Sequence, residues 1–302
     1  MKIRPFMIPA LLRPWFLVLG LSACASPEVQ EVQPRNLPIV ELMTFNIRYG
    51  TARDGDFSWP ARCQHVAAVI RREYPEVLAI QEGLAFQLED LADVLADYTK
   101  LGQHRDGGMR GEFSGLYVRK DAVQLLDSGE LWLSPTPEQV GSKGWDAALP
   151  RMAVWADVRL DDGSSHQSTE HHNVVRIYGT HFDHRGEQAR LESAKLLVEH
   201  AKGGPPAVFL GDFNAIETSA PMMAFVADSY ASAVATWDPQ NTLGTFNGFK
   251  RADGGRRIDH VIYAPRFLVH DAHILDDCFD GIWPSDHFPV TAVLELLPAP
   301  GL

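Results

Sequence analysis

Hydrophobic residues along this 302-residue chain fall into two patterns. Short apolar or alternating runs bounded by turn-forming residues predict strands, and they cover residues 39–47, 77–81, 98–102, 115–119, 123–133, 152–160, 174–180, 207–211, 257–263 and 288–296. Apolar positions at helical spacing, such as Leu191, Ala194 and Val198, predict helices over residues 61–73, 85–96, 187–202 and 219–227. Strands outnumber helices, and several follow one another directly. The pattern therefore predicts an α/β (α+β) fold that is not a purely parallel, doubly wound sheet.

Polar side chains collect where five of these strands end or begin. The segments are 43–47 (MTFNI), 78–83 (LAIQEG), 178–184 (YGTHFDH), 210–215 (LGDFNA) and 283–290 (WPSDHFPV). Each segment alone has a structural explanation, because Glu82 could cap the next helix and Asn46 or Asp286 could close a turn. Together they bring carboxylates, amides and imidazoles to strand ends, where α/β enzymes tend to place their sites.

This mixture of side chains fits one kind of chemistry best. Carboxylate and amide oxygens are hard ligands that suit Mg²⁺ or Mn²⁺, and Mg²⁺ completes its shell with water and substrate phosphate. Imidazoles and amide N–H groups can contact phosphate oxygens that gain charge, while an acid orients the attacking water. We therefore expect a hydrolase that cleaves phosphate esters with Mg²⁺ or Mn²⁺ as its cofactor.

Six short motifs carry a resemblance to a known family. TFNIRYG, IQEG, THFDH, GDFNA, RIDHVIY and SDHFPV occur in the order found in the endonuclease/exonuclease/phosphatase superfamily, which has the DNase I-like fold. The segments SWPARCQHVAAVI, GEFSGLYVRKD and GSKGWDAALPR are similar to a bacterial exported branch related to carbon catabolite repressor deadenylase-like proteins. The resemblance spans residues 42–297. It implies a domain over residues 39–298, built as a four-layer sandwich of two packed mixed β-sheets flanked by helices.

For the metal, the resemblance implies three residues. Glu82 matches the principal metal ligand of the family, Asn46 matches the amide beside it, and Asp286 matches a position that approaches the metal. One departure concerns the acid that some nuclease branches carry two residues after the strand-one asparagine, because this chain has Arg48 there. We leave the role of Arg48 open.

For catalysis, the resemblance implies five further residues. Asp212 matches the acid that positions or deprotonates the attacking water, and Asn214 the amide that contacts the scissile phosphate. His181 corresponds to the phosphate-binding histidine of the deadenylase-like and sphingomyelinase-like branches. His287 corresponds to the histidine that stabilises the transition state or transfers a proton, and Asp259 to the acid that orients it.

Three other residues lie beside these motifs. Arg151, Arg185 and Asp183 are candidates for contacts with substrate, and each also has a plain salt-bridge interpretation. Within phosphoester hydrolysis the substrate stays open, because the same site serves nucleic acid, phospholipid and small phosphorylated molecules in this superfamily. We place a phosphodiesterase or nuclease-like activity first, and a phospholipid or sugar/inositol phosphate phosphatase second.

Two alternatives belong to other classes of protein. A catalytically idle, lipid-anchored binding protein would keep the fold while losing site residues, yet of the expected residues only the branch-variable acid is missing. A glycosidase would need two carboxylates across one cleft, and Glu82 and Asp212 are candidates. That hypothesis leaves His181, His287 and Asn214 unexplained.

The start of the chain has the layout of a lipoprotein signal peptide. Residues 1–24 have a basic head, an apolar stretch too short to span a bilayer, and a lipobox-like ending at Cys24. We expect lipidation of Cys24, a tether over residues 25–38, and a monomer in the cell envelope, at the outer membrane facing periplasm or outside because Ala25 is not Asp.

Charge and cysteine content limit the partners further. Removal of residues 1–24 would take away three of the 27 basic residues and none of the 39 acidic ones, changing the formal charge from −12 to −15. An acidic surface of this kind argues against a broad nucleic-acid footprint, because phosphate backbones are held mostly by Lys and Arg. Cys63 and Cys278 have no zinc-type spacing, and an exported protein offers them the chance to pair.

Overall fold

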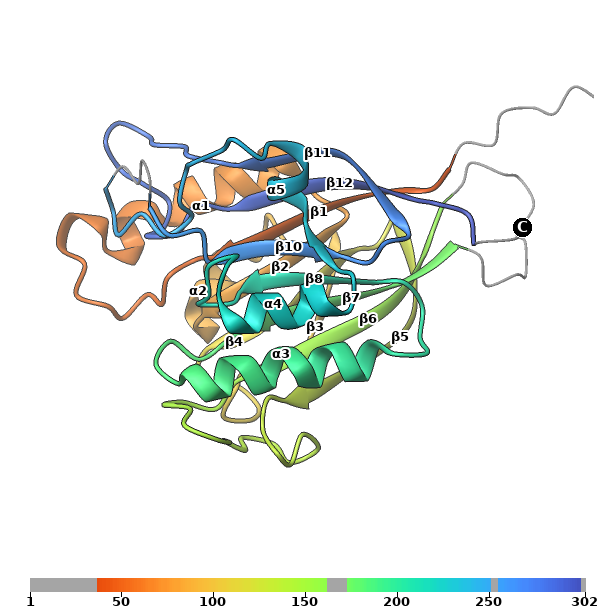
Figure 1. The fold of residues 1–302 in the computed structure, drawn as a ribbon. Helices are drawn as coiled ribbons and strands as arrows, with labels where there is room; N and C mark the ends of the chain where they lie inside the picture. The colour runs from red at the N-terminus through yellow and green to blue at the C-terminus, as the bar shows by residue number, and fades with distance from the viewer. Residues whose placement is uncertain (1–36, 162–172, 251–254, 300–302) are drawn as a thin grey trace, which may run out of the picture. The chain divides into compact units, whose positions relative to one another are not determined.

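Two six-stranded β-sheets form the centre of the protein in the computed structural model, which describes residues 37–161, 173–250 and 255–299 (Figure 1). The first sheet consists, in spatial order, of β11 (Phe267–Ile274), β12 (Val290–Leu296), β1 (Ile39–Asn46), β2 (Val77–Gly83), β4 (Phe113–Arg119) and β3 (Tyr98–Leu101). The second consists of β5 (Val123–Trp132), β6 (Met152–Leu160), β7 (Val174–His181), β8 (Ala207–Asp212), β10 (Asp259–Tyr263) and β9 (Ala231–Ser232). Among the strands that the structure describes, only the pairs β1–β2 and β7–β8 are parallel. Both sheets are therefore mixed, as predicted.

Helices cover the outer face of each sheet. Helices α1 (Trp59–Glu73) and α2 (Ala85–Asp90) pack on the first sheet, and α3 (Glu187–Ala201) and α4 (Ala220–Ala227) pack on the second. The remaining helices are η1 (Gly55–Phe57) and α5 (Ala233–Trp237). This arrangement is the predicted four-layer sandwich.

The alternation of side chains along the strands explains the layers. Leu42 of β1 points into the core between the sheets, where it joins Ile177 and Val208. Its neighbour Met43 points to the opposite face, into the core shared with α1 and α2. Successive strand residues face opposite sides of a sheet, so a strand that is apolar on both faces is buried on both.

Two of the larger elements differ from the sequence prediction, and the short elements η1, β9 and α5 were not predicted. The helix predicted over residues 85–96 ends at Asp90, and the chain continues in turns closed by bonds such as that from Val94 N–H to the Leu91 carbonyl. Strand β11 was not predicted. Buried and exposed residues alternate along most of β11, as expected for a strand. The register shifts at a bulge between Val269 and Asp271, and there two successive polar residues, His270 and Asp271, both lie outside the core.

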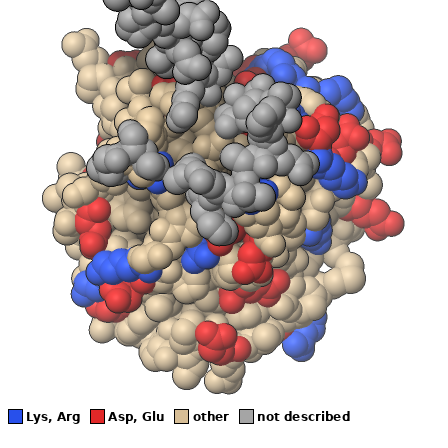
Figure 2. Space-filling view, turned by 90° about the vertical axis from the view of Figure 1, so that its right-hand side faces the viewer, with Lys and Arg blue, Asp and Glu red and all other residues tan. Residues whose placement is uncertain are grey.

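The parallel strands carry polar residues at one end of the sandwich. The start and the end of the domain lie at the opposite end, before β1 and after β12. β1 runs from Ile39 to Asn46, and the Leu296 N–H bonds the Pro38 carbonyl at the far end. That far end shows acidic and basic side chains close to one another (Figure 2).

Several sequence predictions fall outside the described residues. These are the signal peptide, Cys24 and most of the tether. Among the described residues, no helix has the length and apolar character needed to cross a membrane. Cys63 is buried, Cys278 is exposed, and both thiols are free in the structure.

Candidate active site

Three polar side chains lie next to one another across the second sheet. The register pairs His181 at the end of β7 with Asp212 at the end of β8, and Asp212 with Asp259 at the start of β10. All three residues are buried. β7 and β8 come close here because position 211 is glycine: a Cβ there would lie 2.1 Å from the Thr180 carbonyl oxygen. The sheet itself therefore brings together three residues that are far apart in sequence.

The first sheet contributes Glu82 and Asn46. A register shift between Ile80 and Gly83 and a positive φ of 62° at Glu82 turn its side chain out of the strand pattern, a strained conformation typical of functional sites. Asn46 Nδ2 donates to Glu82 Oε1 (3.1 Å) and to Asp212 Oδ2 (3.0 Å). The Asn46 amide thus joins the two sheets at the site.

His287 is held between two carboxylates. Its Nδ1 lies 2.8 Å from Asp259 Oδ2, and its Nε2 lies 3.9 Å from Asp212 Oδ2. Burial works against the charged ring, but the charges of Asp259 and Asp212 outweigh it and raise the pKa of His287 well above its usual range. Burial also raises the pKa of Asp212, and the Asp259 charge adds to this. We therefore assign the proton to His287, so that a cation lies beside Asp212.

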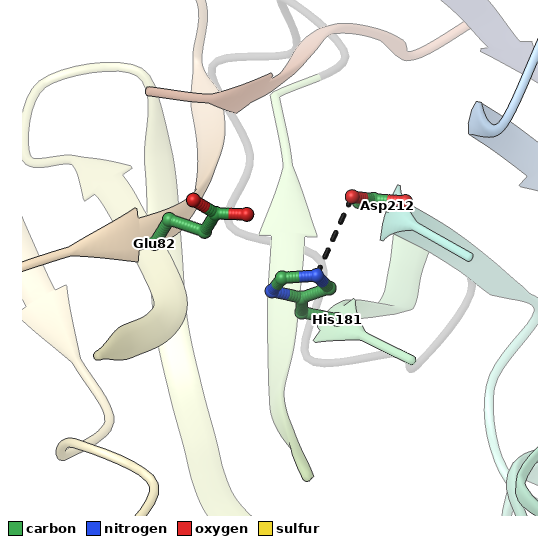
Figure 3. A group of neighbouring side chains, drawn as sticks. All are labelled: Glu82, His181 and Asp212. Atoms are coloured by element: carbon green, nitrogen blue, oxygen red, sulfur yellow. Dashed lines mark ion pairs between the residues drawn. The ribbon is translucent and has the colours of Figure 1, made fainter. Parts of the chain in front are cut away.

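His181 approaches Asp212 from the other side. Its Nε2 is 3.4 Å from Asp212 Oδ2, with Glu82 nearby across the sheets (Figure 3). Burial, followed by the positive charge of Arg151, lowers the pKa of His181 well below its usual range. Asn214 has a left-handed backbone (φ 49°), and its N–H donates to Asp212 Oδ1 at 2.8 Å. The two histidines that flank Asp212 therefore differ in charge.

Asp286 is buried and paired with an arginine. Its side chain is 7% exposed, and its Oδ2 is 3.4 Å from Arg48 Nη1. Arg48 also holds Asp54 through two bonds of 3.1 and 3.0 Å. Burial raises the pKa of Asp286, with Glu82 adding to the effect and His287 and Arg48 opposing it.

The three residues considered for substrate contacts have different environments. Arg151 is 5% exposed and bonds the histidines His181 and His184. Asp183 is 2% exposed, and its carboxylate accepts backbone N–H groups from Leu149, Arg185 and Gly186. Arg185 is exposed. Of these three residues, only Arg185 is exposed to solvent. The Asp183 carboxylate already accepts backbone hydrogen bonds, so a contact with substrate would compete with them.

Two functional neighbours were not identified from the sequence. Arg62 on α1 is fully buried, and its guanidinium bonds the carbonyls of Ile47, Arg48, Phe57 and Pro284. Ser285 Oγ donates to the Asn46 carbonyl at 2.7 Å. A signal for Arg62 does exist, because it precedes Val66 and Ile70 at four-residue spacing and so belongs to the apolar face of its helix.

The donor set fits a hard divalent cation. Oxygen and nitrogen atoms of Glu82, His181 and Asp212 lie within 4.8 Å of one another, as do those of Asp212, Asp259 and His287. Burial raises the pKa of Asp212 and of Asp286, with neighbouring carboxylates adding to the effect, and a bound cation would favour the ionised form of both. Carboxylate oxygens are the ligands that Mg²⁺ and Mn²⁺ prefer. The site can therefore bind such a cation, with Glu82 as its most accessible carboxylate.

Comparison with known proteins agrees with this geometry. Residues 43–287 match the model of the Endonuclease/Exonuclease/phosphatase family. The chain belongs to this family. Members hydrolyse phosphoesters and depend on a divalent metal. No curated protein sequence matches the chain.

Solved structures from bacteria resemble it over nearly their whole length. An endonuclease/exonuclease/phosphatase from Bacteroides vulgatus is 33% identical, with a TM-score of 0.76 over 85% of this chain and 99% of that one. The mannosyl-6-phosphatase of Bacteroides thetaiotaomicron VPI-5482 is 31% identical, with a TM-score of 0.74 over 84% and 99%. D. rerio TDP2 in complex with a single-strand DNA product is 16% identical with a TM-score of 0.64, which shows a shared fold alone.

Proposed function

We propose that this protein is an enzyme that hydrolyses a phosphate ester by attack of water, with Mg²⁺ or Mn²⁺ as cofactor. The observation that carries the proposal is the position of Asp212. Its Oδ2 lies within 3.9 Å of Asn46 Nδ2, His181 Nε2 and His287 Nε2, so one carboxylate is shared by both sheets and both histidines. The fold brings the strand ends together, but the polar or ionisable side chains at all of them are what a catalytic site needs.

The residues around Asp212 supply complementary functions. Asp212 accepts a hydrogen bond from the attacking water and orients it toward phosphorus. His287, kept charged by Asp259, stabilises negative charge that develops on the phosphoryl oxygens or donates a proton to the leaving group. Asn214 and His181 contact the scissile phosphate. Asp212, His181 and His287 are buried, Asn214 is half-buried, and all four are held by neighbours before substrate arrives, so little reorganisation is needed.

The metal site would centre on Glu82. Asn46 orients the Glu82 carboxylate through Nδ2, while Asn46 Oδ1 accepts the Arg48 N–H at 3.0 Å. When bound there, a divalent cation supplies Lewis-acid polarisation of the phosphoryl group and charge neutralisation. Asp286, which lies 3.4 Å from Arg48, is a further carboxylate that would favour the cation.

For the substrate, two observations favour a phosphomonoester of a small molecule over the nuclease-like phosphodiester cleavage that we placed first from the sequence. The mannosyl-6-phosphatase relative shares 31% identity over almost its entire chain. Arg48 also occupies the position of the acid found in some nuclease branches, with 26% of its side chain exposed beside Asp286. A monoester carries close to two negative charges at pH 7, one more than a diester, so the loss of a carboxylate at position 48 removes repulsion that would act against it.

A panel of substrates tests the proposal. We expect p-nitrophenyl phosphate and sugar phosphates such as mannose 6-phosphate to be hydrolysed with Mg²⁺ or Mn²⁺, faster than bis(p-nitrophenyl) phosphate or DNA. Activity should disappear with EDTA and return when metal is added back. Full activity in EDTA would refute the metal mechanism, and a clear preference for nucleic acid would return the enzyme to the phosphodiesterase class.

Substitutions separate an enzyme from an idle binding protein. Asp212→Ala and His287→Ala should each lower kcat by about 10²–10⁴-fold with the fold intact. His270→Ala on the exposed face of β11 is the matched control and should leave kcat unchanged. Binding of phosphorylated ligands without turnover by the unmodified protein would instead favour the binding-protein alternative.

A further inference from the structure

Arg151 makes an unusual contact with His181. Arg151 directly precedes β6, and its guanidinium is almost completely buried. Its Nη1 lies 2.9 Å from His181 Nδ1, and its Nη2 lies 3.2 Å from His184 Nδ1. A histidine at a phosphate site is more familiar beside a carboxylate, which would accept a hydrogen bond from the ring N–H.

The direction of this hydrogen bond is fixed by chemistry. A guanidinium has five N–H donors and no acceptor, so the Arg151–His181 bond exists only if His181 Nδ1 accepts. A neutral imidazole that accepts at Nδ1 carries its proton on Nε2. His181 is therefore a donor at Nε2, the atom that faces Asp212 Oδ2 at 3.4 Å.

This tautomer removes His181 from the set of metal ligands. Its Nε2 lies in the same cluster as oxygens of Glu82 and Asp212, which makes the three residues look like a metal site. A metal binds the bare lone pair of a ring nitrogen. With Nδ1 occupied by Arg151 and Nε2 protonated, His181 has no lone pair to give.

Asn214 supports the same direction of donation. Its Nδ2 lies 3.3 Å from His181 Nε2 and 3.1 Å from the Phe182 carbonyl, which accepts from it and so sets the orientation of the amide. Two nitrogens that both carry protons do not bond each other. They can instead share one acceptor, and the oxygen of a phosphoryl group is an acceptor of the right kind.

We propose that Arg151 is a positioning residue that holds His181 as the Nε2–H tautomer, so that His181 and Asn214 form a donor pair for one phosphoryl oxygen and His181 does not bind the metal. This inference rests on the proposed function for its ligand. The charge of Arg151 is compensated by Glu112 and by Asp183, whose Oδ2 lies 3.7 Å from Arg151 Nε. Arg151 Nε makes no hydrogen bond among the described residues, so these two carboxylates act on the guanidinium through their charge.

Metal binding gives the first test, because it needs no substrate. Titration of the full-length protein with Mn²⁺ should give the same affinity, within about twofold, for the unmodified protein and for His181→Gln. Glu82→Gln should weaken Mn²⁺ binding by at least tenfold. A tenfold or larger loss in His181→Gln would show that His181 is a ligand and would overturn the proposal.

Histidine NMR gives the second test. Long-range ¹H–¹⁵N spectra of the unmodified protein should show a His181 ring with a protonated Nε2 and a bare Nδ1. Arg151→Met should lose that signature and become a tautomer mixture, while Arg159→Met, on β6 and bonded to Gln124, should not. A proton on Nδ1 in the unmodified protein would overturn the proposal even if every variant failed to fold.

Kinetics gives the third test and separates the two proposals. Gln can place an amide N–H near the position of imidazole Nε2, so His181→Gln should keep more than a tenth of kcat, whereas His181→Ala should lose about 10²–10³-fold. Arg151→Met should lose about 10–100-fold in kcat. Equal losses for Gln and Ala would contradict donation as the role of His181. If no phosphoester is hydrolysed at all, the proposed function fails, while the Mn²⁺ and NMR results still decide the tautomer.

Discussion

At the scale of single residues, the two histidines of the site show how neighbours set opposite chemistries. Both rings are buried, which by itself disfavours a charged imidazole. His287 faces the carboxylates of Asp259 and Asp212 and has a raised pKa, whereas His181 faces Arg151 and has a lowered one. One site thus holds a charged and a neutral histidine on either side of Asp212.

The charge of His287 predicts a pH dependence. Asp259 contributes to the raised pKa of His287, so this ring stays charged until the pH rises through its folded-state pKa. Asp259→Asn should lower that pKa and move the alkaline limb of the kcat profile to lower pH, together with a loss of about 10–100-fold at the optimum. Kinetics from pH 5 to 10 measure this. Asp271→Asn, on exposed β11, is the control, and an alkaline limb that stays in place would show that His287 does not set it.

Asp183 predicts a dependence of stability on pH. Burial opposes its ionised form, but N–H bonds from Gly186, Arg185, Ala148 and Leu149 outweigh this and lower its pKa to about 2. Because the folded-state pKa is below the unfolded value of 3.8, the ionised form stabilises the fold above pH 4, and this contribution fades between pH 4 and 2. Asp183→Asn should therefore cost about 2 kcal/mol at pH 7 and about half of that at pH 3.

Urea unfolding at the two pH values measures this difference, and the control Asp271→Asn, at a partly exposed position of β11, should change little. The result also decides between the two interpretations of Asp183. A substrate ligand would raise KM when replaced and leave the free energy of unfolding unchanged, which is the opposite of what the backbone bonds indicate.

At the scale of elements, the site depends on α1 as much as on the strands. Arg62 reaches from this helix to the carbonyls of Ile47 and Arg48, after β1, and to that of Pro284, just before Asp286 and His287. Ser285 links the same two segments through the Asn46 carbonyl. Burial lowers the pKa of Arg62 to about 10, which still leaves it charged at neutral pH. A single buried cation thus fixes two loops of the site to one helix.

Arg62→Met should destabilise the protein by about 3 kcal/mol, because buried carbonyls lose a charged donor that no neighbour replaces. We also expect a lower kcat, since the loops that hold Asn46 and Asp286 lose their common support. Chemical unfolding and steady-state kinetics check both effects. Arg71→Met, exposed on the same helix, should change the free energy of unfolding by less than about 0.5 kcal/mol. Similar values for the two variants would contradict the role given to Arg62.

The elements also show what a sequence can predict. Buried strands such as β8 and their polar ends, from Gly211 to Asn214, are predictable because continuous apolar runs and turn residues mark them. The short length of α2 and the bulged β11 were missed, since tertiary contacts and a register shift decide them. The positive φ of Glu82 and the tautomer of His181 lie beyond sequence patterns, because they depend on Gly83 in a bulge and on Arg151 across the sheet.

At the scale of the molecule, two-sheet packing explains why six scattered motifs form one site. Parallel strands β1 and β2 in one sheet, and β7 and β8 in the other, direct their carboxyl ends to the same edge, where Asn46 bonds Asp212. β12 is antiparallel to β1, so the segment before it, with Asp286 and His287, arrives at that edge too. The topology therefore explains why motifs that are far apart in the sequence meet at one edge of the molecule.

The same topology separates the site from the start of the domain. β1 begins at Ile39 and reaches the site at Asn46, so its length alone places these residues about 25 Å apart. If Cys24 carries lipid, as we expect from its sequence, residues 25–38 would connect the membrane to the end of the sandwich that lies away from Asp212. An extended tether of that length spans up to about 50 Å. A tether of that length would leave the site accessible to soluble phosphate esters.

Two measurements test this arrangement. The full-length protein should sediment with membranes and Cys24→Ala should not, since a chain without its acylated cysteine loses the anchor. A protein that starts at Leu37 should keep kcat and KM for a soluble phosphomonoester within about twofold, because every residue of the proposed site lies in the domain that follows. Membrane retention of Cys24→Ala would count against lipidation. A large loss of activity in the shortened protein would instead show that the preceding segment contributes to the site, despite its attachment at the opposite end of β1.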